Sequence, residues 1–304
     1  MRLRRVAGMV MGGLGLSMCL YAGLTWQASR ATPATPTSAP GAPIAASLTP
    51  VTIGEVTEGR ENGLAVLRLT GQAEAGGVVV VTDRGERVRQ VRVADSGEWT
   101  ASLPIPQNAP MAVEAELFDE GEDQDASRGL RGDQTVFRIH RAADREAGRP
   151  PLVMVGAPAA PTRIVSSPFG GLPGDGPLYL GAIDYDDSGG VIVSGLCEVP
   201  GRVRVYVAGT AIGETRIGPD GRWAFIAPTV LPLGASEVRA ELQPERRSDP
   251  RSVVSVTLRR LPPLADADGE EGGALAVAFE PSLWQVRRAL LGGGVQSTVV
   301  FAPE

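Results

Sequence analysis

Few side chains in this sequence could carry out chemistry, and histidine and cysteine are the scarcest of them. The chain has one histidine, His140, and two cysteines, Cys19 and Cys197. A structural zinc site needs about four such ligands, so none is expected. All 29 basic residues are arginine, which excludes a lysine nucleophile and a GxxxxGK[ST] phosphate loop. We therefore predict no catalytic residues, no enzyme activity and no cofactor.

Acidic residues gather in two runs, 119–125 and 184–187. Extracellular calcium sites use carboxylates on loops, but neither run has the spacing of an EF-hand loop. The tripeptide Arg131-Gly132-Asp133 spells an integrin motif, which is expected by chance in a stretch rich in these residue types. The sequence therefore favours solvated loops at these places and no metal site.

Two tryptophans, Trp99 and Trp223, could stack on sugar rings or fill protein cores. They occupy equivalent places in an internal repeat, because residues 69–104 align with residues 193–228 without a gap. In each copy the indole follows a turn that ends in glycine and begins the next strand. This shared position favours a structural role for both tryptophans, each in the core of its own repeat.

Apolar residues alternate with polar ones in both copies of the repeat, with frequent glycine between the runs. This pattern is typical of short antiparallel strands joined by tight turns. The predicted fold is mainly β, with two immunoglobulin-like antiparallel β-sandwich domains. The domains are predicted at residues 51–140 and 179–260, with a Pro/Gly-rich linker at 141–178 and an acidic linker at 261–273.

The N-terminal region, residues 1–30, is predicted to be a membrane anchor or signal. Three arginines precede an uncharged run at residues 6–26, whose 21 residues would span about 30 Å as a helix. The favoured interpretation is a retained transmembrane helix, with a cleaved signal peptide and a lipoprotein signal as alternatives. It predicts a single-pass protein of the bacterial inner membrane with its bulk in the periplasm, separated by a Pro/Ala/Thr-rich tether at 31–50.

The formal net charge of −6 argues against nucleic-acid binding, for which a basic face would supply most of the affinity.

The C-terminal region, residues 274–304, has a spacing that could form a helix. Val286, Ala289 and Leu290 recur at i, i+3 and i+4. The segment also contains Ser282-Leu283-Trp284 and Thr298-Val299-Val300-Phe301. With these stretches it resembles the first part of a LysM module. With the glycine-rich repeats before it, the chain resembles alphaproteobacterial LysM peptidoglycan-binding proteins that carry a membrane anchor and bacterial Ig-like domains.

The resemblance implies a partial βαα LysM segment at 274–304 that lacks its closing strand. It also implies peptidoglycan glycan strands as the partner and a glycan site at Pro281, Ser282, Leu283 and Trp284, with other envelope proteins as further partners. A second interpretation stays open: a structural or protein-interaction spacer whose degenerate LysM no longer binds glycan.

Overall fold

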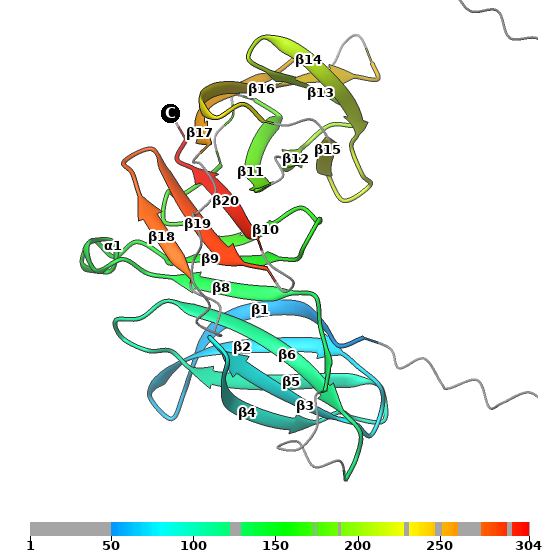
Figure 1. Cartoon of the computed structure of the whole chain (residues 1–304), viewed down its shortest axis with the longest axis vertical. Helices are drawn as coiled ribbons and strands as arrows, with labels where there is room; N and C mark the ends of the chain where they lie inside the picture. The colour runs from blue at the N-terminus through cyan, green and yellow to red at the C-terminus, as the bar shows by residue number, and fades with distance from the viewer. Residues whose placement is uncertain are drawn as a thin grey trace, which may run out of the picture. The chain divides into compact units, whose positions relative to one another are not determined.

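The computed structural model describes residues 50–121, 129–172, 174, 176–187, 190–227, 231–246, 251–260, 275–290 and 294–303. Nearly all of its regular structure is antiparallel β-sheet (Figure 1), and the prediction of a mainly β protein is confirmed. Residues 47–304 form one compact unit. Its strands belong to four sheets, which we name A to D.

Sheets A and B enclose the core of the first repeat. Sheet A has the strand order β1-β2-β5, and sheet B has the order β4-β3-β6-β8-β9-β10 with β7 paired to β6. Apolar residues such as Leu67, Val79 and Leu103 face one another between the sheets and are fully buried. The strands are β1 (Thr52–Glu61), β2 (Leu64–Gln72), β3 (Val78–Asp83), β4 (Glu86–Arg92), β5 (Glu98–Pro104), β6 (Met111–Phe118), β7 (Leu130–Arg131), β8 (Thr135–Ile139), β9 (Leu152–Gly156) and β10 (Arg163–Ser166).

Sheets C and D enclose the core of the second repeat. Sheet C has the order β15-β12-β11-β20-β19-β18, and sheet D has the order β14-β13-β16-β17. Their core includes Leu180, Val205 and Trp223. The strands are β11 (Leu178–Asp186), β12 (Val191–Cys197), β13 (Gly201–Val207), β14 (Thr210–Arg216), β15 (Arg222–Ala227), β16 (Gly234–Pro244), β17 (Val253–Arg260), β18 (Ala276–Phe279), β19 (Leu283–Ala289) and β20 (Val295–Phe301).

The internal repeat reappears as a repeat of strand order. In the first copy β1-β2-β5 faces β4-β3-β6-β8, and in the second copy β11-β12-β15 faces β14-β13-β16-β17. Each copy is therefore a β-sandwich of three strands against four. The added strands lie at the outer ends of sheets B and C, and they come from the two regions that the sequence did not assign to either sandwich.

Each repeat contains a glycine directly across from its tryptophan. Gly71 pairs with Trp99 between β2 and β5, and Gly195 pairs with Trp223 between β12 and β15. Both indoles are buried, with 2% of each residue exposed. A Cβ atom at either glycine would collide with the facing indole and with a backbone oxygen of the neighbouring strand. Glycine is needed at these two places because the indole occupies the space that a side chain would need.

The described residues of the expected linker at 141–178 belong to the fold and include a helix and two strands. A short helix, α1 (Ala142–Glu146), follows β8 and is succeeded by β9 and β10. All five residues of β9 are buried, and β9 pairs with β8 over its full length. The prediction of a semi-extended linker is therefore wrong for these residues, because their apolar side chains are part of two cores.

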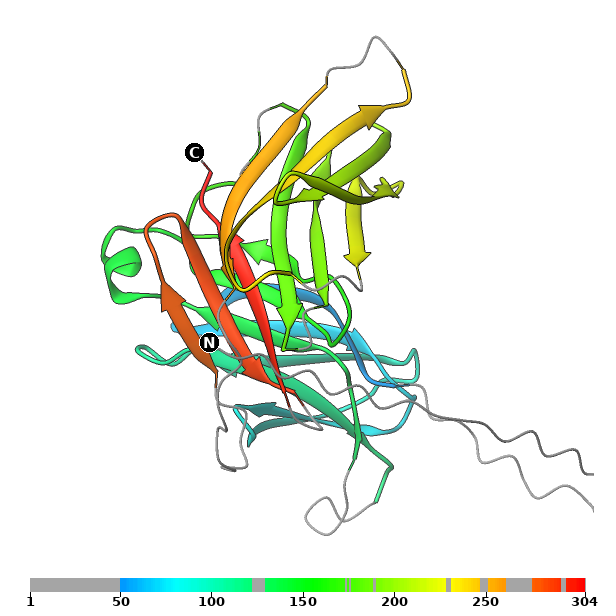
Figure 2. The same cartoon turned by 45° about the horizontal axis from the view of Figure 1, so that its top comes forward.

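The expected LysM segment is also wrong, because the described residues of 275–303 form strands. Figures 1 and 2 show β18, β19 and β20 side by side, with β20 next to β11. Strand β20 pairs antiparallel with β11 from Ala182 opposite Val300 to Asp186 opposite Gln296. The C-terminal strands thus extend sheet C of the second sandwich, and neither of the two expected helices forms.

The predicted single-pass location in the inner membrane is corrected by the structure. Within the described residues, no helix is long and apolar enough to cross a bilayer, and the helix found there, α1, has five residues. The expected span at 6–26 lies outside the described residues, as does almost all of the tether at 31–50 and the whole acidic linker at 261–273.

Candidate functional site

The residues expected to bind glycan lie at the start of β19 and have different surroundings. Pro281 and Ser282 are exposed in the turn before the strand, whereas Leu283 and Trp284 are buried. Because neighbouring side chains of a strand point to opposite faces, Leu283 enters the core between sheets C and D. Trp284 enters a third core, between sheets B and C. Neither side chain is available to stack on a sugar.

The third core joins the two repeats to one another. It contains Phe137, Ile139, Leu152 and Met154 from sheet B, and Trp284, Val286 and Val300 from sheet C. The Trp284 ring meets Phe279 edge-on at 4.7 Å between centroids and Phe169 at 5.6 Å, and the Arg141 guanidinium lies 5.6 Å from its centroid. We call this contact, together with the polar groups beside it, the B–C interface.

A buried carboxylate, Asp184, forms the polar part of this interface. It lies on β11 with 1% of the residue exposed. Its Oδ2 accepts a hydrogen bond from the Thr162 N–H (2.9 Å), and its Oδ1 accepts from the hydroxyls of Thr162 (2.6 Å) and Thr298 (2.5 Å). Thr162 belongs to the β9–β10 loop and Thr298 to β20, so one carboxylate connects three segments.

Arg288 adds a second polar connection across the same interface. From β19, its guanidinium donates to the Thr135 hydroxyl of β8 (2.7 Å) and to Gln296 Oε1 of β20 (2.9 and 2.6 Å). Burial lowers the pKa of Arg288, while the nearby carboxylates of Glu114, Asp184 and Asp133 raise it. The arginine spans the two repeats through directional hydrogen bonds, which favour one relative placement of the sheets.

Burial also raises the pKa of the Asp184 carboxyl, because removal from water disfavours its charged form; the threonine hydrogen bonds and Arg288 act in the opposite direction. When folding raises the pKa of a carboxyl, the contribution of that group to the free energy of unfolding is fully present at pH values below its unfolded pKa of about 4. That contribution is lost as the pH rises through the higher folded pKa. We predict that Asp184→Asn flattens this part of the stability profile, measured by urea unfolding at pH 3.5 to 8.

The asparagine in this variant can satisfy the site: its oxygen can accept from the Thr162 N–H, and its nitrogen can donate to the two hydroxyls. Asp184→Ala leaves the N–H buried without this partner, so we expect it to cost about 1–3 kcal/mol at all pH values tested. A difference profile between wild type and Asp184→Asn that is independent of pH would show that Asp184 does not titrate as inferred.

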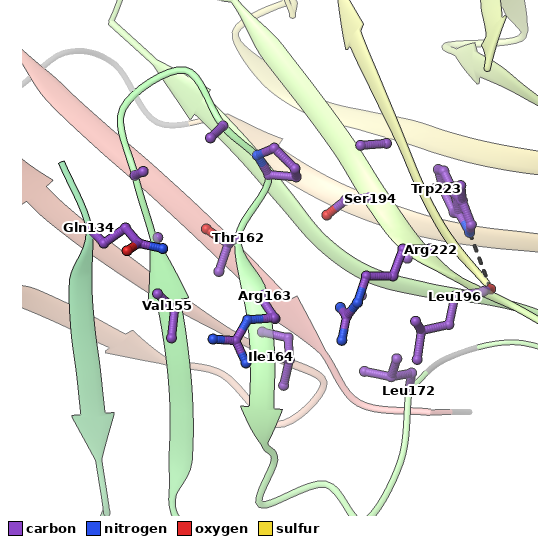
Figure 3. A pocket seen from close by; sticks show the side chains of 17 residues that line it. Gln134, Val155, Thr162, Arg163, Ile164, Leu172, Ser194, Leu196, Arg222 and Trp223 are labelled. Carbon is purple, nitrogen blue, oxygen red and sulfur yellow. Dashed lines mark hydrogen bonds between the residues drawn. The ribbon is translucent and has the colours of Figure 1, made fainter. Parts of the chain in front are cut away.

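A cleft lies beside the B–C interface, between the β9–β10 hairpin and the outer face of sheet C. Its volume is about 480 Å³, within the range of small-molecule sites. Figure 3 shows side chains from β10, β12 and β15 around it, with Arg222 extending towards the strand that carries Arg163. The apolar part of its lining includes Val155, Ile164, Leu172, Leu196 and Ala224.

Among the described residues that line this cleft, the ionisable side chains are two arginines, Arg163 and Arg222. Arg163 donates to the Gly54 carbonyl oxygen at 2.9 Å, and Arg222 lies 3.5 Å from Asp220 in an exposed ion pair. The pKa of Arg163 is lowered, first by burial and then by the positive charge of Arg222. The cleft is therefore a positively charged site on a chain with net charge −6.

The other candidate residues from the sequence have structural partners. Asp186 Oδ1 accepts from the Gly190 N–H, and Asp187 Oδ2 accepts from the Val295 N–H. Arg131 is paired with Glu114, and Cys197 is buried as a free thiol. Among the described residues no group of three or more His, Cys, Asp or Glu is placed to hold a metal ion; part of the first acidic run, 122–125, lies outside them.

Comparisons with known proteins add little. No family model and no curated protein sequence matches the chain. Among solved structures, the chain is similar to the central fibronectin-III array of a RIM-binding protein, with 11% sequence identity and a TM-score of 0.24 over 79% of each chain.

Sequence reasoning did not find the cleft. Its lining comes from residues 134, 155–157, 160–164, 172, 181, 194–196 and 222–224, and no local motif connects them. The one available signal was the apolar run Leu152–Val155 within the expected linker, since a short apolar run bounded by proline is consistent with a buried strand.

Proposed function

We propose that this chain is a non-enzymatic structural and interaction protein, in which two Ig-like β-sandwiches are held in a fixed relative position. The B–C interface is the observation that carries the proposal. It combines an apolar core around Trp284 with hydrogen bonds that Asp184 accepts from Thr162 and that Arg288 donates to Thr135. Contacts of this kind restrict domain motion far more than a flexible linker would.

The absence of enzyme activity is part of this proposal and is supported by the chemistry of the cleft. Arginine stays protonated at physiological pH and cannot act as a general acid or base there. Asp184, a buried carboxyl hydrogen-bonded to the cleft residue Thr162, already accepts three hydrogen bonds from Thr162 and Thr298. The Thr162 hydroxyl donates to Asp184, but both residues are buried in the B–C interface, so we assign this pair a structural role and not that of a nucleophile and its base.

A distance measurement between the repeats tests the fixed placement. Glu86 on β4 and Thr210 on β14 are exposed and can be replaced with cysteine for spin labelling, in the full chain with Cys19→Ala and Cys197→Ala. We expect one narrow distance distribution, because the B–C interface fixes sheets B and C. Adding Trp284→Ala removes the largest side chain of that interface and should broaden the distribution.

The matched control is Leu64→Ala, which removes an exposed apolar side chain of β2 (66% exposed) and should leave the distribution unchanged. A broad or multiple distribution in the protein with native Trp284 would show that the sandwiches move independently, and the proposal of a fixed spacer would be wrong.

Peptidoglycan binding is the alternative function, and it needs a site other than buried Leu283 and Trp284. Pull-down of the full chain on purified murein sacculi tests it, with Pro281→Ala/Ser282→Ala as the variant at the two exposed positions. Under the spacer proposal, any retention on sacculi is unaffected by this double substitution. Retention that is lost in the variant would support glycan binding at the turn before β19 instead.

A further inference from the structure

We propose that the cleft between the β9–β10 hairpin and the outer face of sheet C binds the carboxylate of an apolar organic anion. The inference goes beyond the spacer role, since it assigns a ligand to a site. It rests on three features of the cleft: a pair of arginines, an apolar lining next to them, and side-chain hydrogen-bonding groups at known positions.

The arginine pair gives the site its charge preference. Both guanidinium groups line the same cleft, and the positive charge of Arg222 helps to lower the pKa of Arg163, after burial. An anion bound between the two groups would offset this repulsion on Arg163. Arginine presents several N–H donors in one plane and binds carboxylates through paired hydrogen bonds.

The apolar lining determines what must be attached to the carboxylate. Leu172 and Leu196 lie near Arg222 in Figure 3, and Ile164 lies beside Arg163. These side chains would gain from contact with a hydrocarbon group and would gain little from a free inorganic anion. The volume of about 480 Å³ accommodates a ligand of a few residues or a short acyl chain, and it excludes a folded partner domain from the interior of the cleft.

Polar groups on two sides of the cleft can orient such a ligand. The Ser194 side chain stands on the outer face of β12, where its hydroxyl lies 3.4 Å from the Ala182 carbonyl. The Gln134 amide comes from the segment before β8, and its Oε1 accepts from the Ile53 N–H at 2.6 Å. Gln134 lies across the cleft from Ser194 (Figure 3), so its amide nitrogen and the Ser194 hydroxyl could pair with amide groups of a ligand on either side.

Two sources provide this chemistry: the C-terminus of a peptide with apolar last residues, and a free aliphatic carboxylate. Calorimetric titration of the full chain with three probes distinguishes them. The probes are an N-acetylated apolar tripeptide with a free carboxylate, the same tripeptide with a C-terminal amide, and octanoate. We expect binding of one or both carboxylates and at least about a 10-fold weaker affinity for the amide, because a charge-assisted hydrogen bond is lost.

Substitutions in the cleft should change the same affinity. Arg163→Gln and Arg222→Gln are each expected to weaken carboxylate binding about 10-fold, and Arg163→Lys by less, because it keeps the charge but not the paired geometry. Arg259→Gln, at an exposed position of β17, is the matched control and should bind like the wild type. Thermal unfolding of each variant verifies that the fold is intact.

Three results would overturn the inference: no binding of either carboxylate at millimolar concentration, equal affinity for acid and amide, or arginine variants that bind as well as the wild type. None of them bears on the spacer proposal, which the distance measurement between the repeats tests separately.

Discussion

Replacement of Trp284 with alanine is expected to lower the free energy of unfolding by about 3–5 kcal/mol, the usual cost of removing a buried aromatic side chain. Trp284 is 1% exposed, and its ring is enclosed by Phe279, Phe169 and the Arg141 guanidinium. Because the indole lies between sheets B and C, its loss leaves a cavity where the two repeats meet. Urea unfolding followed by circular dichroism measures the change.

Phe279→Ala is the matched control for this substitution. Phe279 contacts the Trp284 ring, but 41% of it is exposed, so its removal should cost clearly less, about 1 kcal/mol. A glycan-binding indole on an exposed loop would give the opposite order, with Trp284→Ala nearly neutral. A cost below about 1 kcal/mol for Trp284→Ala would therefore contradict the B–C interface.

The twofold repeat of short strands could be predicted because its signals are local. Alternation along Val203–Val207 places every second side chain in the core, and the turns before Trp99 and Trp223 contain the residues that tight turns require. Such features depend on neighbours a few positions away. They do not reveal which additional strands a sheet will accept, because that choice depends on segments distant in sequence.

The C-terminal strands were not predicted, because their place in the sheet depends on segments distant in sequence. Strand β19 is central in its part of sheet C, between β18 and β20, and the residues Leu283–Val286 are all buried. A strand covered on both faces has no alternation of apolar and polar residues. The spacing of Val286, Ala289 and Leu290 then imitates a helix face. The neighbouring strand β20 joins the sheet by pairing with β11, whose residues lie 110 to 118 positions earlier in the chain.

The prediction of a linker at 141–178 was wrong for the same reason, since a strand buried on both faces shows no alternation. Strand β9 has apolar partners on both faces, since Val153 and Val155 belong to the core of the first repeat while Leu152 and Met154 face Trp284. The prolines on both sides of this strand favoured a linker in the sequence, although they lie in the flanking loops. The candidate cleft could not be foreseen either, because Arg163 from this hairpin meets Arg222 only after both segments have folded.

The second large effect is expected from alanine at either glycine that faces a tryptophan. In Gly195→Ala the new methyl group would collide with the Tyr179 carbonyl oxygen and would lie 2.9 Å from the Trp223 ring. Two strands on opposite sides of β12 would have to move, and overpacking of this kind costs about 1–3 kcal/mol or more. We expect Gly195→Ala to lower the free energy of unfolding by at least about 2 kcal/mol, measured by urea unfolding.

Gly71→Ala tests whether the first repeat has the same steric restriction at its glycine as the second repeat has at Gly195. Its methyl group would meet the Thr52 carbonyl oxygen and the Trp99 ring at 2.6 Å, so we expect a cost as large as that at Gly195.

Gly59, in strand β1, provides the control: the nearest atom to a Cβ there is Val66 Cγ2 at 4.0 Å, and Gly59→Ala should be neutral or slightly stabilising. Equal effects at Gly59 and Gly195 would mean that strand propensity alone explains the glycines. A large effect confined to Gly71 and Gly195 would show that each sandwich depends on close packing of an indole against a glycine, which explains why both copies carry the same pair.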